Sequence, residues 1–133
     1  ARVSNVLDKT VFVGKQAKIA DYLGVSDVSL LPSELESFGL AALEAQACEV
    51  PVVASRVGGI PEVINDGETG FMSDTGDTEK MSDDVLTLLN DEEMRLSFGS
   101  RGRELAISRY SSEKIIPQYI AFYEKVLQRK STT

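Results

Sequence analysis

Two glutamates, Glu36 and Glu44, are the residues of this chain best suited to chemistry. They stand on either side of a predicted helix start. Glu44 comes eight residues after Glu36, which corresponds to about 12 Å along a helix axis at roughly 1.5 Å per residue. A carboxylate can accept hydrogen bonds from the hydroxyl groups of a ligand. A nucleoside diphosphate sugar fits across this distance, with a hydroxylated ring at each carboxylate and its phosphates between them.

The segment between the glutamates predicts a helix N-terminus that can bind phosphate. Ser37 is a suitable N-cap, and the amides of Phe38, Gly39 and Leu40 then have no acceptor within the helix. Gly39 has no side chain, so a ligand can approach its backbone closely. Unpaired amides and the positive end of the helix dipole both favour a phosphate. The alternative is that water satisfies these amides, as at most helix starts.

Glu44 is predicted to lie on the apolar side of this helix, which is expected to cover residues 38–48. Leu40, Leu43 and Ala47 repeat at helical spacing, and at about 100° per residue Glu44 falls inside the arc that they define. A carboxylate there needs a partner, because an unpaired buried charge is costly. Two kinds of partner remain open: an amide or lysine of the protein itself, or the hydroxyl groups of a ligand.

The elements that must position these residues alternate along the chain. Strands are predicted at residues 11–13, 28–31, 51–54 and 70–72. Helices are predicted at residues 19–24, 38–48, 61–64, 78–89, 91–110 and 112–129. This alternation predicts an α/β fold in which helices cover both faces of a parallel sheet.

Ligands of such sheets bind beyond the carboxyl ends of the strands, where the glutamate segment lies. Gly58 and Gly59 follow the third predicted strand and form a second flexible element at the same crevice; a plain turn is the alternative. Lys15 is the nearest cation after the first strand; a solvated side chain is the alternative. Asp77 is expected to cap the helix that follows the fourth strand.

The composition excludes several classes of function. The chain has 133 residues, with 14 Lys and Arg against 21 Asp and Glu, and a net charge of −7. An acidic balance argues against nucleic acid and anionic membranes as partners. The chain has no histidine and one cysteine, which excludes a histidine base, an intrachain disulfide and a cysteine-based zinc site. We therefore expect a single cytoplasmic domain that holds no metal.

The motifs resemble those of the retaining glycosyltransferases of family four, which have the GT-B fold. The segment from Glu36 to Leu40, together with Glu44, is similar to the family's pair of glutamates separated by seven residues. Further similar segments lie at residues 11–14, 26–28, 51–62 and 66–71. The resemblance covers nearly the whole chain. It implies a Rossmann-like parallel sheet, with residues 1–133 as part of a GT-B donor domain that ends in a helix at about 112–129.

The resemblance also implies which positions bind a nucleotide-sugar donor, namely Gly14, Lys15, Glu36, Ser37, Phe38, Gly39, Leu40 and Glu44. Glu36 would be catalytic and contact hydroxyl groups of the transferred sugar. The amides of residues 38–40 would contact the sugar and the diphosphate. Glu44 would hold the ribose, and the segment at Gly14 would border the nucleobase.

The implied reaction is retaining transfer of a sugar from a UDP-sugar to a small-molecule acceptor, with no cofactor besides the donor substrate. Residues 14–16 and 33–39 are most similar to family members of bacillithiol biosynthesis, which implies UDP-N-acetylglucosamine as donor and L-malate as acceptor. The acceptor site and the cations that clamp the diphosphate would precede this chain, so we expect the 133 residues alone to be inactive. A module that binds nucleotide sugar without turnover, or a structural fragment, remains an alternative.

Two further expectations follow from the resemblance. Glu49 occupies the place of a family glycine at the end of a helix, where glycine best tolerates a left-handed backbone, so strain is expected there. The family's first two strands would lie between residues 11–13 and 28–31 in the sheet. Without them, one strand edge and the apolar side of the last helix are open, which favours a homodimer. Direct pairing of residues 11–13 with residues 28–31 in a monomer is the alternative.

Overall fold

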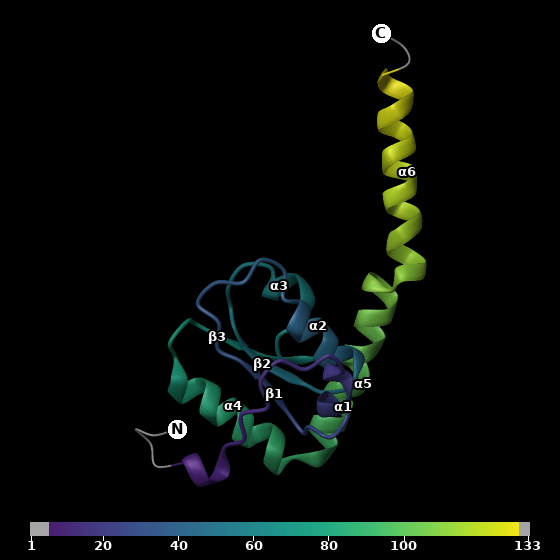
Figure 1. Ribbon diagram of the computed structural model, residues 1–133. Helices are drawn as coiled ribbons and strands as arrows, with labels where there is room; N and C mark the ends of the chain where they lie inside the picture. The colour runs from purple at the N-terminus through teal and green to yellow at the C-terminus, as the bar shows by residue number, and fades with distance from the viewer. Residues whose placement is uncertain (1–5, 131–133) are drawn as a thin grey trace.

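The computed structural model describes residues 6–130, which form a three-stranded parallel sheet and its covering helices (Figure 1). The strands are β1 (Ser29–Leu31), β2 (Val52–Ser55) and β3 (Gly70–Ser73), in the spatial order β1-β2-β3. Val53 of β2 pairs with Leu30 on one side and Phe71 on the other. The parallel sheet and three of the four predicted strands are therefore confirmed.

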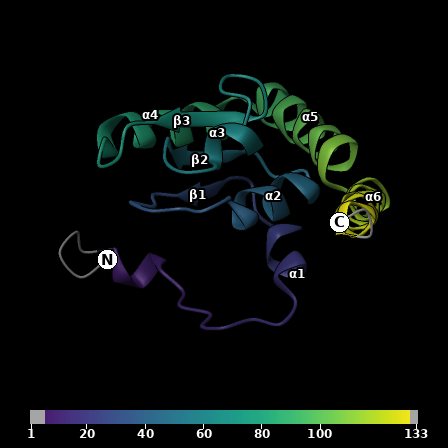
Figure 2. The same cartoon turned by 90° about the horizontal axis from the view of Figure 1, so that it is seen from above.

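The helices also follow the predicted pattern. They are α1 (Ile19–Leu23), α2 (Leu40–Ala47), α3 (Ile60–Val63), α4 (Thr78–Asn90), α5 (Glu92–Tyr110) and α6 (Ser112–Lys130), with a short 3-10 helix at Leu7–Lys9. Asp77 caps α4, because its side chain accepts a hydrogen bond from the Lys80 amide at 3.0 Å. Seen from above, β1 lies nearest the N-terminal segment and α1, whereas β3 lies beside α4 and α5 (Figure 2).

The side chains of β2 divide the core into two layers. Val52 and Ala54 pack with α2 and α3, in a cluster that includes Ala42, Ile60 and Met72. Val53 points the other way and packs with Met81, Leu88 and Phe98 of α4 and α5. Every residue of β2 is buried, since helices cover both faces of this strand. This arrangement explains why the strand has a continuous apolar run instead of alternating polar and apolar residues.

The predicted strand at residues 11–13 is wrong. These residues form neither helix nor strand, and the side chains of Val11 and Phe12 are 84% and 77% exposed. A strand is stable only when its backbone groups are paired by a neighbour. β1 has β2 as its partner on one side, and no other strand of the described residues 6–130 pairs with it. The proposed direct pairing of residues 11–13 with β1 is therefore also wrong.

The predicted buried face of α2 is only partly right, because Leu43 packs half-buried against the core but Leu40 and Ala47 are exposed. The helix buries Ala42, Ala45 and Gln46, whereas Leu40 is 63% exposed and Glu44 lies on the exposed side. Apolar residues occur all around this helix, so spacing alone does not select a face. Ala42 and Ala45 face the sheet, since their small side chains let the axis of α2 lie close to β2. The Glu44 carboxylate is therefore exposed to solvent. It does not need a protein partner to compensate for a buried charge.

The strain expected at Glu49 is confirmed. Its φ of 63° makes it the one non-glycine residue with positive φ among residues 6–130. We expect Glu49→Gly to raise the free energy of unfolding by about 0.5–1 kcal/mol, since relief of left-handed strain exceeds glycine's extra unfolded-state entropy. Urea denaturation measures the change. Arg103→Ala is the control, because the Glu49–Arg103 ion pair at 3.7 Å is exposed and contributes little. A lower stability of Glu49→Gly would contradict the strain.

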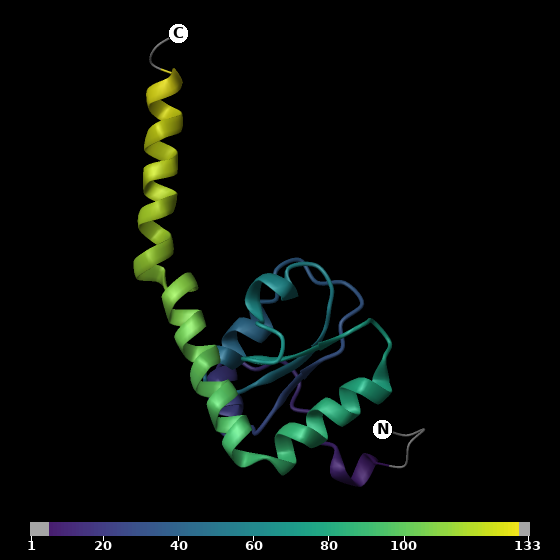
Figure 3. The ribbon, with the colours of Figure 1, turned by 180° about the vertical axis from the view of Figure 1, so that it is seen from behind.

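The last helix leaves the body of the molecule. Figure 3 shows α5 running beside the sheet and α6 projecting away from it after the chain turns between them. Apolar and aromatic side chains of α6 are more than half exposed, among them Ile116, Tyr119, Phe122 and Tyr123. Within the described part of the chain, no helix combines the length and apolar character needed to cross a membrane.

Candidate functional site

The candidate site lies where two loops meet at the carboxyl ends of neighbouring strands. The first loop, residues 32–39, follows β1 and leads into α2; the second, residues 56–59, follows β2 and leads into α3. A Cβ placed on Gly58 would lie 1.5 Å from the Glu36 carbonyl oxygen, and one on Gly59 would lie 2.7 Å from the Phe38 Cα. The two loops therefore touch backbone to backbone, so Gly58 and Gly59 lie beside the glutamate segment.

The predicted cap of α2 is wrong. The helix begins at Leu40, and the capping residue is Gly39, with a φ of 96°, instead of Ser37. A side chain at Gly39 would also press on Ile60, whose Cδ1 would lie 2.7 Å from the added Cβ. Glycine is thus required here twice, once for the backbone conformation and once for the close contact with α3.

This change of cap moves the free amides of the site. The first helical bond runs from the Leu43 amide to the Gly39 carbonyl, so the amides of the first turn are those of Leu40, Ala41 and Ala42. The Gly39 amide instead donates to Glu36 Oε1 at 3.3 Å. Of the three amides predicted to be free at residues 38–40, only that of Leu40 belongs to the first turn. The helix N-terminus still presents unpaired donors and the positive end of its dipole.

The Glu36 side chain is half-buried and lies at the start of this turn. Its Oε1 accepts the Gly39 amide, which holds the carboxylate against the entrance of α2. A carboxylate has about four acceptor positions, so Glu36 keeps capacity to accept hydrogen bonds from a ligand. The neighbouring Ser37 is exposed, and Phe38 is half-buried.

Glu44 lies one turn further along α2, on its exposed side. Together with Leu43 and Ala47 it lines a groove of about 290 Å³, whose other wall is formed by Ala106, Ile107, Tyr110 and Ser111. Within residues 6–130, the Glu44 carboxylate has no hydrogen bond or ion pair with the protein. The sequence left two kinds of partner open for Glu44, a group of the protein or a ligand. Among the described residues, no protein group fills this role.

Gly14 and Lys15 lie apart from this contact network. Gly14 has a φ of 63°, and a Cβ placed on it would have no heavy atom within 4 Å. Lys15 is exposed and forms no ion pair with any residue that the structure describes. The structure thus brings together Glu36 to Leu40, Gly58 and Gly59, and it places no contact between Gly14 or Lys15 and them.

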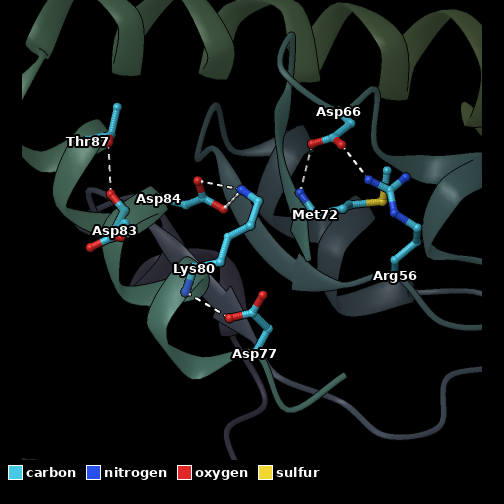
Figure 4. Close-up of polar contacts among 8 residues, drawn as sticks. All are labelled: Arg56, Asp66, Met72, Asp77, Lys80, Asp83, Asp84 and Thr87. Atoms are coloured by element: carbon cyan, nitrogen blue, oxygen red, sulfur yellow. Dashed lines mark hydrogen bonds and ion pairs between the residues drawn. The ribbon is translucent and has the colours of Figure 1, made fainter. Parts of the chain in front are cut away.

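A carboxylate not predicted from the sequence supports the second loop. Asp66 Oδ1 accepts the Met72 amide of β3 at 2.9 Å, and Asp66 Oδ2 pairs with Arg56 Nη2 at 2.5 Å (Figure 4). The Arg56 amide also donates to the Ser73 carbonyl at 2.8 Å. Residue 56 is therefore held at both its backbone and its side chain, two positions before Gly58. In the sequence, the dipeptide Asp66-Gly67 is typical of a turn, but nothing near it indicates the pairing of Asp66 with Arg56.

A second residue that sequence analysis missed is Tyr110, the last residue of α5. Its hydroxyl donates to the Glu62 carbonyl of α3 at 2.7 Å. Its ring meets Phe38 edge to face, with centroids 5.5 Å apart. Phe38 and Tyr110 line a groove of about 480 Å³, completed by the α6 residues Ile115, Gln118, Tyr119 and Phe122. No local pattern predicts these contacts, which join residues far apart in sequence.

Acidic residues and the cysteine do not gather into a metal site. Among residues 6–130, no group of three or more Asp, Glu or Cys side chains is placed to hold a metal ion.

Comparison with known proteins agrees with this geometry. Residues 2–105 match the family described as glycosyl transferases group 1. The chain is 48% identical over 124 residues to N-acetyl-alpha-D-glucosaminyl L-malate synthase of Bacillus anthracis, covering 93% of this chain and 32% of that protein. It is 40% identical over 115 residues to alpha-maltose-1-phosphate synthase of Mycolicibacterium smegmatis, covering 82% of this chain and 30% of that protein.

Solved structures show the same fold. Sucrose-phosphate synthase from Thermosynechococcus elongatus superimposes with a TM-score of 0.93 at 31% identity, over 96% of this chain and 33% of that one. Anabaena HepE in complex with UDP superimposes with a TM-score of 0.85 at 25% identity, over 89% of this chain and 33% of that one. The chain thus spans about a third of the length of the relatives it matches.

Proposed function

Because this chain belongs to the group 1 glycosyl transferases, a family of enzymes with the GT-B fold, we propose that residues 1–133 are part of a domain that binds a nucleotide-sugar donor. The reaction is retaining transfer of the sugar to a small-molecule acceptor. One observation carries this proposal: Glu36 and the N-terminus of α2 meet the loop at Gly58 and Gly59 beyond the carboxyl ends of β1 and β2. Parallel sheets bind nucleotides at such a place.

The proposed donor is a UDP-sugar. HepE, whose fold this chain shares, has been solved in complex with UDP, with UDP and glucose, and with UDP-glucose. The amides of the first turn of α2 suit a diphosphate, since they are unpaired donors at the positive end of a helix dipole. When the glycosidic bond breaks, negative charge grows on the departing diphosphate. Fixed donors aimed at that charge stabilise the transition state more than the ground state.

Each residue of the site has a proposed part in binding the donor. Glu36 accepts hydrogen bonds from hydroxyl groups of the transferred sugar and is the proposed catalytic residue. Ser37, Phe38 and Gly39 border the sugar. Leu40 and the following residues of the first turn present amides to the diphosphate, and Glu44 holds the ribose hydroxyls. Gly14 and Lys15 are proposed to border the nucleobase, with support from sequence motifs alone.

The proposed substrates are UDP-N-acetylglucosamine and L-malate, supported by the 48% identity to a synthase of that name. The test uses the protein that carries this chain, incubated with UDP-N-acetylglucosamine and a panel of small acids, with product followed by mass spectrometry. Formation of N-acetylglucosaminyl malate with the α configuration is expected. Transfer to another acceptor would leave the reaction class intact and overturn the acceptor. UDP-sugar binding without transfer to any acceptor would favour a binding module instead.

Glu44→Ala is expected to weaken UDP binding by about 1–3 kcal/mol, a roughly 5- to 150-fold rise in Kd, because charge-assisted hydrogen bonds to the ribose are lost. The melting temperature should stay the same, since this exposed carboxylate has no partner among residues 6–130. Calorimetric titration with UDP measures the affinity, and Glu93→Ala, an exposed glutamate on α5, is the control. Unchanged UDP affinity would remove Glu44 from the nucleotide site.

The 133 residues on their own are expected to form a homodimer. The outer edge of β1 pairs with no strand of the described residues, and Leu30 at this edge is 53% exposed. The exposed apolar side chains of α6 add a second surface that water solvates poorly. Sedimentation at micromolar concentration measures the mass. A single 14.5 kDa species that unfolds cooperatively would contradict the dimer.

The proposed compartment is the cytoplasm. The one cysteine, Cys48, allows no intrachain disulfide, which fits a reducing environment. Its side chain packs against the core cluster between α2 and β2 and is free of disulfide bonding.

A further inference from the structure

We propose that Tyr110 is a positioning residue for the donor site: it fixes the loop of Glu36 and Phe38 to the end of α5, where α6 begins. This inference rests on the proposed function of that loop. Tyr110 is not among the residues proposed to bind the donor. It acts through two neighbours, the Glu62 carbonyl and the Phe38 ring.

The first contact joins α5 to α3. The Tyr110 hydroxyl donates to the Glu62 carbonyl at 2.7 Å, across 48 positions of sequence. α3 has only four residues, so its last carbonyls lack an amide partner within the helix. Tyr110 supplies that missing donor. α3 starts directly after Gly59, whose backbone lies against Ser37 and Phe38.

The second contact joins α5 to the glutamate loop itself. The Tyr110 and Phe38 rings meet edge to face, with centroids 5.5 Å apart and planes inclined by 77°. This geometry places the positive edge of one ring on the negative face of the other. Phe38 directly precedes Gly39, whose amide binds Glu36 Oε1 at 3.3 Å. A shift of the Phe38 ring would therefore move the Gly39 amide and, through its hydrogen bond, the Glu36 carboxylate.

Tyr110 also forms a wall of both grooves beside the site. It lines the groove of about 290 Å³ that contains Glu44, and the groove of about 480 Å³ that contains Phe38 and α6 side chains. The next residue, Ser111, has extended backbone angles and separates α5 from α6. Tyr110 thus lies at the junction of α5 and α6 and also contacts the loop of Glu36. This single residue therefore connects the start of α6 with the position of Glu36.

The test compares Tyr110→Phe and Tyr110→Leu in the protein that carries this chain. Tyr110→Phe keeps the ring contact and loses the hydroxyl, and Tyr110→Leu loses both. We expect kcat to fall about tenfold and about 10²-fold, respectively, because a displacement near 1 Å at a catalytic group costs about 10²-fold. In Tyr110→Phe, which keeps the ring beside Glu44, the Kd for UDP should change less than twofold. Tyr123→Phe is the matched control, because that ring contacts Phe122 on α6 instead of the loop.

A second measurement is independent of activity. Amide hydrogen exchange at Gly39, whose amide donates to Glu36 Oε1 at 3.3 Å, should speed up about tenfold in Tyr110→Phe and stay unchanged in Tyr123→Phe. A lower melting temperature with unchanged kcat and unchanged exchange would show that Tyr110 only stabilises the fold, and would overturn the proposal. Equal losses of kcat and UDP affinity would also overturn it. If the unmodified protein neither binds UDP nor transfers sugar, the proposed function is wrong, and the exchange rates alone still decide whether Tyr110 holds the loop.

Discussion

Glu36→Gln is expected to lower the rate of sugar transfer by roughly 10²–10³-fold, the usual cost of removing one group that stabilises charge in a transition state. Glutamine keeps an oxygen that can accept the Gly39 amide, so the turn before α2 should persist. What is lost is the negative charge beside the transferred sugar, where positive charge develops as the glycosidic bond breaks. Steady-state kinetics with the UDP-sugar, in the protein that carries this chain, measures the effect.

The affinity for UDP separates this role from a nucleotide-binding one. It should change less than about twofold in Glu36→Gln, because the proposed contacts of Glu36 are to the sugar. Glu34→Gln is the matched control: Glu34 lies in the same loop and is exposed. If Glu36→Gln loses as much UDP affinity as turnover, Glu36 binds the nucleotide and is not the catalytic residue.

Gly58→Ala is expected to lower the free energy of unfolding by about 2–5 kcal/mol, the sum of left-handed strain and overpacking. Gly58 has a φ of 52°, and the new Cβ would lie 1.5 Å from the Glu36 carbonyl oxygen. Backbone cannot give way as a flexible side chain can, so the two loops must separate. UDP-sugar binding should then be lost together with stability, since the separated loop carries Glu36 and leads into the first turn of α2, whose amides are proposed to bind the diphosphate.

Gly67→Ala isolates the part of this effect that comes from strain. Gly67 has a φ of 76°, but a Cβ there would meet no heavy atom within 4 Å. Its cost should be about 1–2 kcal/mol, with donor binding intact. Urea denaturation and calorimetric titration of both variants make the comparison. Equal losses of stability, with binding retained in Gly58→Ala, would mean that the contact between the loops does not shape the site.

Much of this protein was determined by local sequence. Val52 to Ala54 form a continuous apolar run that a two-sided parallel strand requires, and the structure buries all three. Asp77 caps α4 because a short acidic side chain reaches the amide three residues on. Glu49 adopts the left-handed backbone because local hydrogen bonds close the end of α2, from the Glu49 amide to the Gln46 carbonyl and from the Val50 amide to the Ala45 carbonyl. For Asp77 and Glu49 the deciding hydrogen bonds join residues within a few positions of each other in sequence.

Other features were decided only by tertiary contacts. Residues 11–13 have the composition of a strand and form none among the described residues, because a strand needs a partner that its own sequence cannot supply. Packing against the sheet decided which face of α2 is buried: Ala42 and Ala45 are buried, and Glu44 is exposed. The helix start was also decided by the folded chain: Gly39 is the cap instead of Ser37, and Ile60 leaves no space for a side chain at position 39.

The candidate site divides in the same way. Its motif residues, Glu36 and Glu44, were visible in the sequence, because a ligand-binding segment keeps its chemistry within a few positions. Their supports were not: Gly58 meets Glu36, and Tyr110 meets Phe38, across gaps in sequence that only the folded chain closes. Residue types and spacing thus predict the chemistry proposed for this site, whereas long-range packing decided how its residues are held in place.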